Sequence, residues 1–310
     1  MAVDVGKAGP SMRGARRRLS AGLWRRPWVK ASALLGPPLA WLLLIYLAAL
    51  VALLVSGLWT QDPVSGKILH TWNTAHFEHI LGLDSDPWDS TYLRIAWTTI
   101  WIAAAVTATD AVVAFPIAYY MARVASSRTR ALLFVLVLLP LWSSYIVRVY
   151  AWRVILKESG ALNWTLNGLG LPDANLAFTQ TSMWLVFSYV WLPFMILPVF
   201  AALERIPDSY LEASGDLGAR GFRTLRSVIL PLALPGIVAG SIFTFSLTLG
   251  DYLTPVLIGG PDAQFIGNVI FANVGVANNV PFAAAYAMVP VIVIAIYLAI
   301  ARRLGAFEAL

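Results

Sequence analysis

Few side chains in this 310-residue sequence are of the types that carry out acid–base, nucleophilic or metal chemistry. The chain has no cysteine, which excludes a disulfide framework and a thiolate metal site. Its three histidines, His70, His76 and His79, lie in one stretch, and the last two are spaced for a zinc site on one helix turn. No second paired motif accompanies them, and no Ser/His/Asp or paired-carboxylate set stands out. The sequence therefore favours neither an enzyme nor a metal protein.

Two acids lie in or beside long apolar segments, Asp110 deep inside one and Asp251 at the end of another. Ionisable residues within a membrane are costly and usually face a partner or a watery path. Carboxylates with aromatic faces suit a path for ammonium groups. The alternative is that the rings pack or form an interface belt and that Asp110 pairs with an arginine such as Arg148. The aromatic candidates are Trp101, Tyr145, Trp191 and Tyr252.

The two arginines near the same end, Arg148 and Arg153, also have two interpretations. Their charges would repel a polycation or attract an anion. Alternatively, they hold the outer loops by hydrogen bonds to carbonyls and anchor at lipid headgroups.

The composition indicates the elements that must position these residues. Of all residues 59% are hydrophobic and 12% are charged, whereas soluble domains carry about 25% charged residues. The chain is therefore expected to lie in a lipid bilayer. Its net charge of +6 does not indicate nucleic acid, because the basic residues sit at the ends of apolar segments.

Six apolar segments predict an all-α, polytopic membrane protein with six transmembrane helices. The first is roughly 39 Å long as a helix, enough to cross about 30 Å of hydrocarbon. It is too long for a signal peptide, so we expect a retained span after a disordered basic tail, residues 1–33. The third contains Arg148 and Arg153 in its second half. The expected spans are 34–59, 94–121, 131–156, 181–203, 228–250 and 282–301.

Charge sets the expected topology of the membrane domain, residues 34–303. Basic residues concentrate on the cytoplasmic side, which places both termini, including the tail 304–310, in the cytoplasm. The loop 60–93 is outside, acid-rich and large enough to meet a partner, and 157–180 is expected to contain turns and a short helix. The only Lys and Arg assigned outside are Lys67, Arg94, Arg148, Arg153 and Lys157, among 22.

The largest cytoplasmic loop, residues 204–227, is expected to contain a short helix. Ser209 and Glu212 fit a capping box, so the helix would begin near Tyr210. Gly218 fits its C-terminus, since glycine adopts a left-handed conformation readily. Tyr210, Ala213 and Leu217 would share one face. Beyond the loop, the pair Gly236 and Gly240 suggests close helix packing, a weak indication of a surface that meets a partner chain.

The spacing in this loop resembles the signature of the membrane subunits of binding-protein-dependent ABC importers. That signature is Glu-Ala-Ala, three residues, Gly, nine residues, then Ile-x-Leu-Pro. Here Glu212, Ala213 and Ser214 precede Gly218 by three residues, and the run 228–231 reads VILP nine residues later. Ser replaces the second Ala, and Val replaces Ile; both replacements keep size and character.

The resemblance implies a type I ABC importer permease fold and a coupling helix that docks on a cytoplasmic ATPase. It implies that Glu212 anchors this helix, that Ala213, Ser214 and Gly218 allow close approach, and that Leu217 belongs to the same face. The partners would be two ATPase subunits, a second permease of related but distinct sequence, and an extracytoplasmic solute-binding protein. The chain has no Walker motif, so it would hold no cofactor, and ATP and Mg would be bound by the ATPases.

Other stretches resemble the spermidine/putrescine-type permease subunits, over nearly the whole chain from the second span on. This resemblance implies polyamine import across a bacterial plasma membrane, with Asp251 in a family-like context. An importer of an amino-acid derivative, an opine-like compound or an oxyanion is the alternative. The stretches are FPIAYYMAR (115–123), LLPLWSSYIVRVYAWRVIL (138–156), GALN (160–163) and GDYLTPVLIGGP (250–261).

Overall fold

The computed structural model describes residues 27–62, 65–85, 87–260 and 263–303 in two compact units, Met1–Val55 and Ser56–Leu310. In the first unit, helix α2 (Pro27–Trp41) continues through one turn of π-helix, η1 (Leu42–Leu47), into α3 (Ala48–Ser56). The stretch Lys30–Ser56, with a mean hydropathy of 2.6, is long and apolar enough to cross a membrane. This confirms the first span. The helix begins at Pro27, within the range 1–33 assigned to the basic tail; residues 1–26 and 304–310 lie outside the described chain.

The second unit is built on long apolar helices. Four stretches in it are long and apolar enough to cross a membrane, and they confirm the second, fourth, fifth and sixth spans. The stretch of α5 continues into a π-helical turn, η2 (Tyr120–Val124). Because the spans are apolar around their whole circumference, they can face lipid on one side and protein on the other. The long helices are α5 (Thr91–Tyr119), α9 (Gln180–Glu204), α12 (Leu230–Leu249) and α14 (Val280–Arg303).

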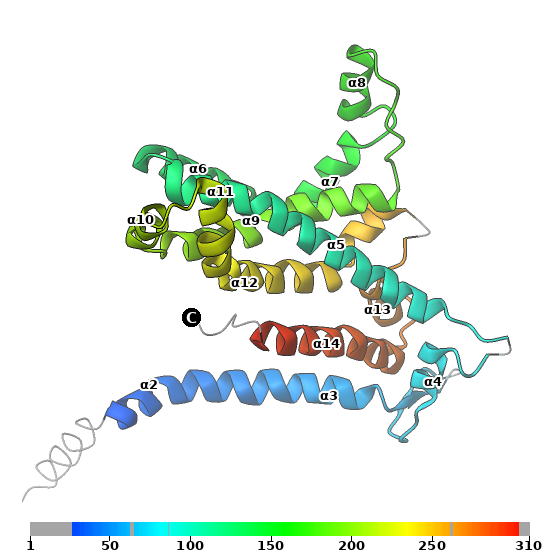
Figure 1. Ribbon diagram of the computed structural model, residues 1–310. Helices are drawn as coiled ribbons and strands as arrows, with labels where there is room; N and C mark the ends of the chain where they lie inside the picture. The colour runs from blue at the N-terminus through cyan, green and yellow to red at the C-terminus, as the bar shows by residue number, and fades with distance from the viewer. Residues whose placement is uncertain (1–26, 63–64, 86, 261–262, 304–310) are drawn as a thin grey trace, which may run out of the picture. The chain divides into compact units, whose positions relative to one another are not determined.

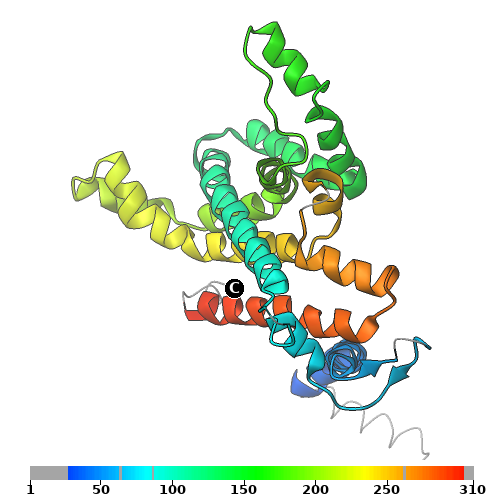
Figure 2. The ribbon, with the colours of Figure 1, turned by 90° about the vertical axis from the view of Figure 1, so that its right-hand side faces the viewer.

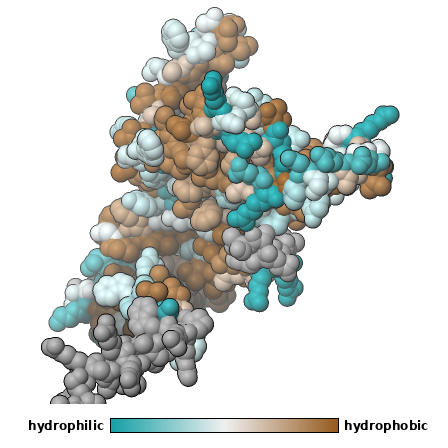
Figure 3. Space-filling model, turned by 90° about the vertical axis from the view of Figure 1, so that its left-hand side faces the viewer, coloured by the Kyte–Doolittle hydropathy of each residue, from teal (hydrophilic) through white to brown (hydrophobic). Residues whose placement is uncertain are grey.

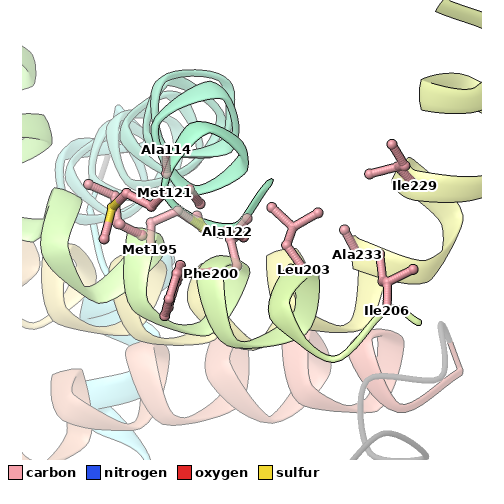
Figure 4. Packing of buried hydrophobic residues seen from close by; sticks show 12 residues of the cluster. Ala114, Met121, Ala122, Met195, Phe200, Leu203, Ile206, Ile229 and Ala233 are labelled. Carbon is pink, nitrogen blue, oxygen red and sulfur yellow. The ribbon is translucent and has the colours of Figure 1, made fainter. Parts of the chain in front are cut away.

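The packed centre of this unit is the contact of α5, α9 and α12, which cross one another closely (Figure 1). Alanines on α5, such as Ala114, are fully buried and let α9 approach. Figure 4 shows one of the resulting clusters, in which Met121, Met195 and Leu203 lie between the helices. Ile229 and Ala233 extend this cluster to the start of α12. The core therefore reaches the end of the bundle where α9 leads toward α12.

The glycine pair on α12 serves packing inside the chain. A Cβ added to Gly236 would clash with the Cβ of Ala202 and lie 2.6 Å from the carbonyl oxygen of Pro198. At Gly240 it would lie 2.7 Å from Sδ of Met195. These neighbours belong to α9, so the expected close packing is confirmed, but the surface involved meets α9 rather than a partner permease.

The third predicted span is two helices. Helix α6 (Ser127–Trp142) and helix α7 (Tyr145–Ile155) meet at 93°. The break falls at Ser143 and Ser144, whose ψ angles of 150° and 136° are extended. The expectation of one continuous helix over 131–156 is therefore wrong. A break in a span is tolerated where neighbouring protein satisfies the freed backbone groups.

Short elements fill the connections at the other end of the long helices. Strands β1 (Thr60–Gln61) and β2 (Ile68–Leu69) form a small antiparallel hairpin. Helix α8 (Ala161–Gly168) confirms the short helix expected within 157–180, and Figure 2 shows it standing away from the long helices. The connection 251–281 contains helical structure that the sequence analysis missed. The remaining short elements are α4 (Ala75–Leu81), η4 (Pro255–Gly259) and α13 (Ile266–Gly275).

The glycine contact gives a test of this packing. Alanine at Gly236 should lower the free energy of unfolding by about 1–3 kcal/mol, because its methyl group must displace the α9 backbone. This steric cost exceeds the gain of about 1 kcal/mol that alanine has over glycine in helix propensity. Gly168→Ala, where a Cβ meets open space, should be neutral or stabilising. Thermal unfolding of the purified protein measures both, and equal effects would contradict the packing.

Candidate functional site: the connection between α9 and α12

The connection between α9 and α12 is fully helical apart from short turns. It contains α10 (Asp208–Asp216), α11 (Gly221–Thr224) and one π-helical turn, η3 (Leu225–Ile229). We call residues 205–229 the coupling segment. Helix α10 confirms the short helix expected within residues 204–227.

The start of α10 differs from the expectation. The helix begins at Asp208 after Pro207, and no side chain caps it. Ser209 therefore lies in the first turn, and the capping box with Glu212 is wrong. The φ of Pro207, −64°, already suits a helix, and Asp208 places a negative charge at the positive end of the helix dipole.

The end of α10 is a Schellman motif. Gly218 has a φ of 77°, which glycine adopts without strain. Its N–H donates to the carbonyl of Gly215 at 2.8 Å, and the N–H of Ala219 donates to that of Ser214 at 3.0 Å. These bonds confirm Gly218 as the terminator and give the segment one defined shape.

Most of the expected docking residues face away from the protein. Leu217 is 87% exposed, and Glu212 and Ala213 are also exposed. Glu212 makes no hydrogen bond or ion pair within the described chain. In Figure 3 the region of α10 and α11 projects beside the apolar helices and carries hydrophilic side chains. The exposed set is Glu212, Ala213, Leu217 and Gly218.

Ser214 points the other way. It is 9% exposed, and its hydroxyl lies 3.0 Å from that of Thr224 in α11. Its side chain therefore joins the two short helices within the segment and does not lie on the exposed face. A small residue at position 214 thus fits the contact between α10 and α11.

Arg123, from η2, anchors the coupling segment to the bundle. Its Nη1 donates to Oδ1 of Asp208 at 2.8 Å, and its Nη2 donates to the carbonyls of Leu203, at 2.6 Å, and Ile206. These carbonyls belong to the last turn of α9 and the turn after it. A cation there adds a charged donor to carbonyls at the end of the helix and matches the negative end of its dipole. The guanidinium thus fixes both the end of α9 and the start of α10.

Arg130, from α6, makes a second anchor nearby. It donates to the carbonyls of Met121, at 3.0 Å, and Ala122, at 3.1 Å, and its Nη1 lies 3.2 Å from Oε1 of Glu204. The sequence analysis counted both arginines only as topology signals. Arg123 ends the stretch 115–123, which resembles the polyamine-type permeases; this was the available indication of its structural role.

The candidate path residues divide into a cluster and scattered positions. The Tyr145 hydroxyl donates to Oδ2 of Asp251 and lies 2.7 Å from Oγ1 of Thr254. The Tyr145 ring stacks on Trp191 with centroids 5.4 Å apart. Asp251 also accepts from Thr254 Oγ1 at 3.0 Å and from the N–H of Leu253 at 2.7 Å. Three of the six candidates therefore meet at the C-terminal end of α12, beside α7.

The other candidates lie apart from that cluster. Tyr252 stacks on Phe271 of α13, with centroids 4.5 Å apart, and Trp101 is 65% exposed on α5. Asp110 is fully buried, and both carboxylate oxygens lack a hydrogen-bond partner within the described chain. The hydroxyl of Ser188 on α9 faces it without adequate hydrogen-bond geometry.

The expected ion pair between Asp110 and Arg148 is wrong. Nη1 of Arg148 lies 3.5 Å from the carbonyl of Val190, at the limit of a hydrogen bond, and its guanidinium sits 5.8 Å from the centre of the Tyr145 ring. Arg153 contacts aromatic rings, including that of Phe178. Within the described residues, rings are thus the main neighbours of both guanidinium groups; the expectation that they hold the outer loops and anchor at headgroups stays a prediction.

The three histidines have separate environments. His70 packs on Trp59, His76 packs on Phe282, and Nδ1 of His79 lies 2.8 Å from Oδ2 of Asp84. Burial lowers the pKa of His76 below its usual value. Within the described residues, His, Asp and Glu form no group of three that could hold a metal ion.

Long apolar helices that could cross a membrane, joined by a connection with one exposed helix, are consistent with a membrane-embedded subunit. Residues 114–306 match the family described as binding-protein-dependent transport system inner membrane component. The chain belongs to this family. It is the permease component of an ABC importer and not the ATPase.

Individual relatives agree with this assignment. The chain is 44% identical to the inner membrane ABC transporter permease protein YdcU of Escherichia coli, over 94% of this chain and 95% of that one. It is 33% identical to the spermidine/putrescine transport system permease protein PotB of Haemophilus influenzae, over 63% of this chain and 68% of that one.

Solved structures show the same fold. A chain of a bacterial ABC transporter for alginate import superposes with a TM-score of 0.64 at 19% identity, over 92% of this chain and 99% of that one. A chain of the MetNI methionine ABC transporter superposes with a TM-score of 0.54 at 19% identity, over 71% of this chain and 96% of that one.

Removal of Arg123 should destabilise the protein more than removal of Asp208, its exposed carboxylate partner. Arg123→Ala removes a charged donor from the carbonyls of Leu203 and Ile206 and should cost about 2–3 kcal/mol of unfolding free energy. Asp208→Ala removes an exposed partner and should cost less than about 1 kcal/mol. Thermal unfolding compares the variants, and limited proteolysis should cut the coupling segment faster only in Arg123→Ala. An equal or larger loss in Asp208→Ala would contradict the anchoring by carbonyls.

Proposed function

We propose that this chain is one of two permease subunits of an ATP-driven importer of polyamines, and that α10 couples it to the ATPases. The observation that carries the proposal is the exposed face of α10, held rigid by Arg123 and by the Schellman turn. A push on a helix fixed at both ends moves the bundle rather than the helix alone. This is the property that transmission of force from an ATPase requires.

The proposed orientation places the coupling segment and both termini in the cytoplasm of a bacterial cell. Within the described residues, Arg123, Arg130, Arg220, Arg223 and Arg226 lie at or near this end of the bundle. Such an excess of basic residues favours the cytoplasmic side. The opposite end, with α4 and α8, would then face the extracytoplasmic solute-binding protein.

The proposed assembly follows from the family. Two cytoplasmic ATPase subunits bind ATP and Mg and hydrolyse ATP, while this chain and a second, related permease form the path through the lipid bilayer. No step in this scheme requires a cofactor or nucleic acid in the chain. In the path, the candidates for cargo contact are Asp110, Trp101, Trp191, Tyr145, Tyr252 and Asp251.

The substrate rests on narrower support. PotB of Haemophilus influenzae is named for spermidine and putrescine, and PotB of Escherichia coli is 30% identical over 69% of this chain. The name of the more similar YdcU specifies no solute. The second candidate is therefore another small solute, such as an amino-acid derivative, an opine-like compound or an oxyanion.

The coupling role predicts a defined loss. Glu212→Ala should leave the fold intact, because its side chain is exposed and unpaired within the described chain. It should reduce solute import by roughly tenfold, the effect of removing an interface residue that contributes more than 1 kcal/mol. Import into proteoliposomes containing the whole complex measures this. The control, Val112→Ala on α5, exposed and outside both the coupling segment and the end with α4 and α8, should import normally; normal import by Glu212→Ala would refute the coupling role.

The substrate has its own test. ATP hydrolysis by the complex, reconstituted with its binding protein, should rise on addition of spermidine or putrescine. Amino-acid derivatives and oxyanions serve as controls and should have no effect. Stimulation by one of these controls instead would overturn the polyamine assignment while leaving the importer architecture in place.

A further inference from the structure

Asp251 is the only one of the path candidates whose carboxylate is surrounded by donors from its own chain. Oδ1 accepts from the N–H groups of Leu253, at 2.7 Å, and Thr254, at 3.3 Å. Oδ2 accepts from the hydroxyls of Thr254 and Tyr145. The residue is 8% exposed. A carboxylate with two internal donors on each oxygen has little capacity left for an ammonium group.

These bonds join two separate parts of the membrane domain. Asp251, Leu253 and Thr254 form the turn between α12 and η4, and the carboxylate bonds the backbone two and three residues ahead of it. Tyr145 is the first residue of α7, directly after the break in the third span. Helix α13 closes over the same turn, since a Cβ on Gly267 would lie 2.5 Å from the carbonyl oxygen of Asp251.

The two halves of the broken span have different attachments. At its start α6 is tied by Arg130 to the carbonyls of Met121 and Ala122. The start of α7 is tied by Tyr145 to the α12–η4 turn, and its ring is held between Trp191 and the guanidinium of Arg148. Between these attachments lies the extended pair Ser143 and Ser144, where the helix is interrupted.

We infer that Asp251 is a positioning residue that pins α7 to the outer end of α12, and that it does not itself bind the cargo. The Tyr145 hydroxyl makes this attachment, which we call the pin, and the side chains of Asp251 and Thr254 receive it and form what we call the socket. With the pin in place, α7 and the α12–η4 turn move as one body, and the Ser143–Ser144 break absorbs their movement relative to α6. This inference assumes the importer function proposed above but does not depend on which solute is carried.

Spin-label distances test the pin without any solute. The chain has no cysteine, so cysteines placed at Val147 on α7 and Val256 on η4, both more than half exposed, would be its only labels. In the complex in nanodiscs, the distance distribution should be narrow in the otherwise unchanged chain. It should broaden in Tyr145→Phe, which removes the hydroxyl and keeps the ring.

Two further variants complete this measurement. Thr254→Val keeps the shape of the side chain but removes a donor from the socket, and it should also broaden the distribution. It serves as the second test if Tyr145→Phe does not fold. Tyr150→Phe, whose hydroxyl has no hydrogen bond within the described chain, is the matched control and should leave the distribution unchanged. A distribution that stays narrow in both Tyr145→Phe and Thr254→Val would overturn the inference.

Import kinetics separate positioning from cargo binding. With spermidine as the probe, Tyr145→Phe and Asp251→Asn should lower the maximal rate and leave KM unchanged. If Asp251 bound the ammonium groups, Asp251→Asn should instead raise KM roughly tenfold or more, the cost of a charged hydrogen bond, and Tyr145→Phe would not reproduce the effect. That result would overturn the inference. If spermidine is not imported by the unchanged complex, the polyamine proposal fails and the spin-label distances still decide the role of Asp251.

Discussion

The attachment of the Arg123 guanidinium to the end of α9 is the interaction on which the position of the coupling segment depends. An exposed helix of nine residues has little stability by itself, because isolated helices of this length are marginal in water. Here three acceptors from two helices and the turn between them converge on one side chain that is 12% exposed. The segment that a partner would push is thereby joined to the most tightly packed part of the bundle.

At the opposite end of the bundle a short helix is also attached by side-chain hydrogen bonds, here from hydroxyl groups rather than a guanidinium. There the chain breaks within a span, and backbone groups that a continuous helix would satisfy need other partners. Ser143 donates its hydroxyl to the carbonyl of Pro140 at 2.7 Å, and Tyr145 fixes the start of the next helix on the socket of Asp251 and Thr254. Rigid attachments on both sides of one extended dipeptide confine movement to that dipeptide. In this account the end of the bundle with the coupling segment is stiff, and the end with α7 has a joint.

Much of this architecture could be predicted from the sequence because lipid imposes simple rules. Long apolar segments marked five spans, and the spacing from Glu212 to Gly218 marked the exposed helix. The break at Ser143 could not be predicted in this way, because the run 131–156 is apolar enough to read as one helix despite its two arginines. The role of Gly236 and Gly240 also required the structure, since spacing shows that backbones approach but not which helix approaches.

Side-chain roles were harder to predict than helices. Asp110 and Asp251 read alike in the sequence as acids in an apolar setting, yet one has no partner within the described chain and the other accepts four hydrogen bonds. Ser214 fits the signature by its size but faces inward, toward Thr224. Such differences depend on contacts between residues far apart in the chain, which a local pattern does not contain.

The central claim, that the exposed face of α10 receives the ATPase, can be tested by cysteine accessibility. Leu217→Cys would place a single thiol on that face. The account predicts that a water-soluble maleimide labels it rapidly in the purified permease and slowly in the complex that contains the ATPases but not the binding protein, whereas Leu169→Cys, at the end of α8, reacts equally in both. Equal labelling of Leu217→Cys in the permease and in the complex would contradict the account.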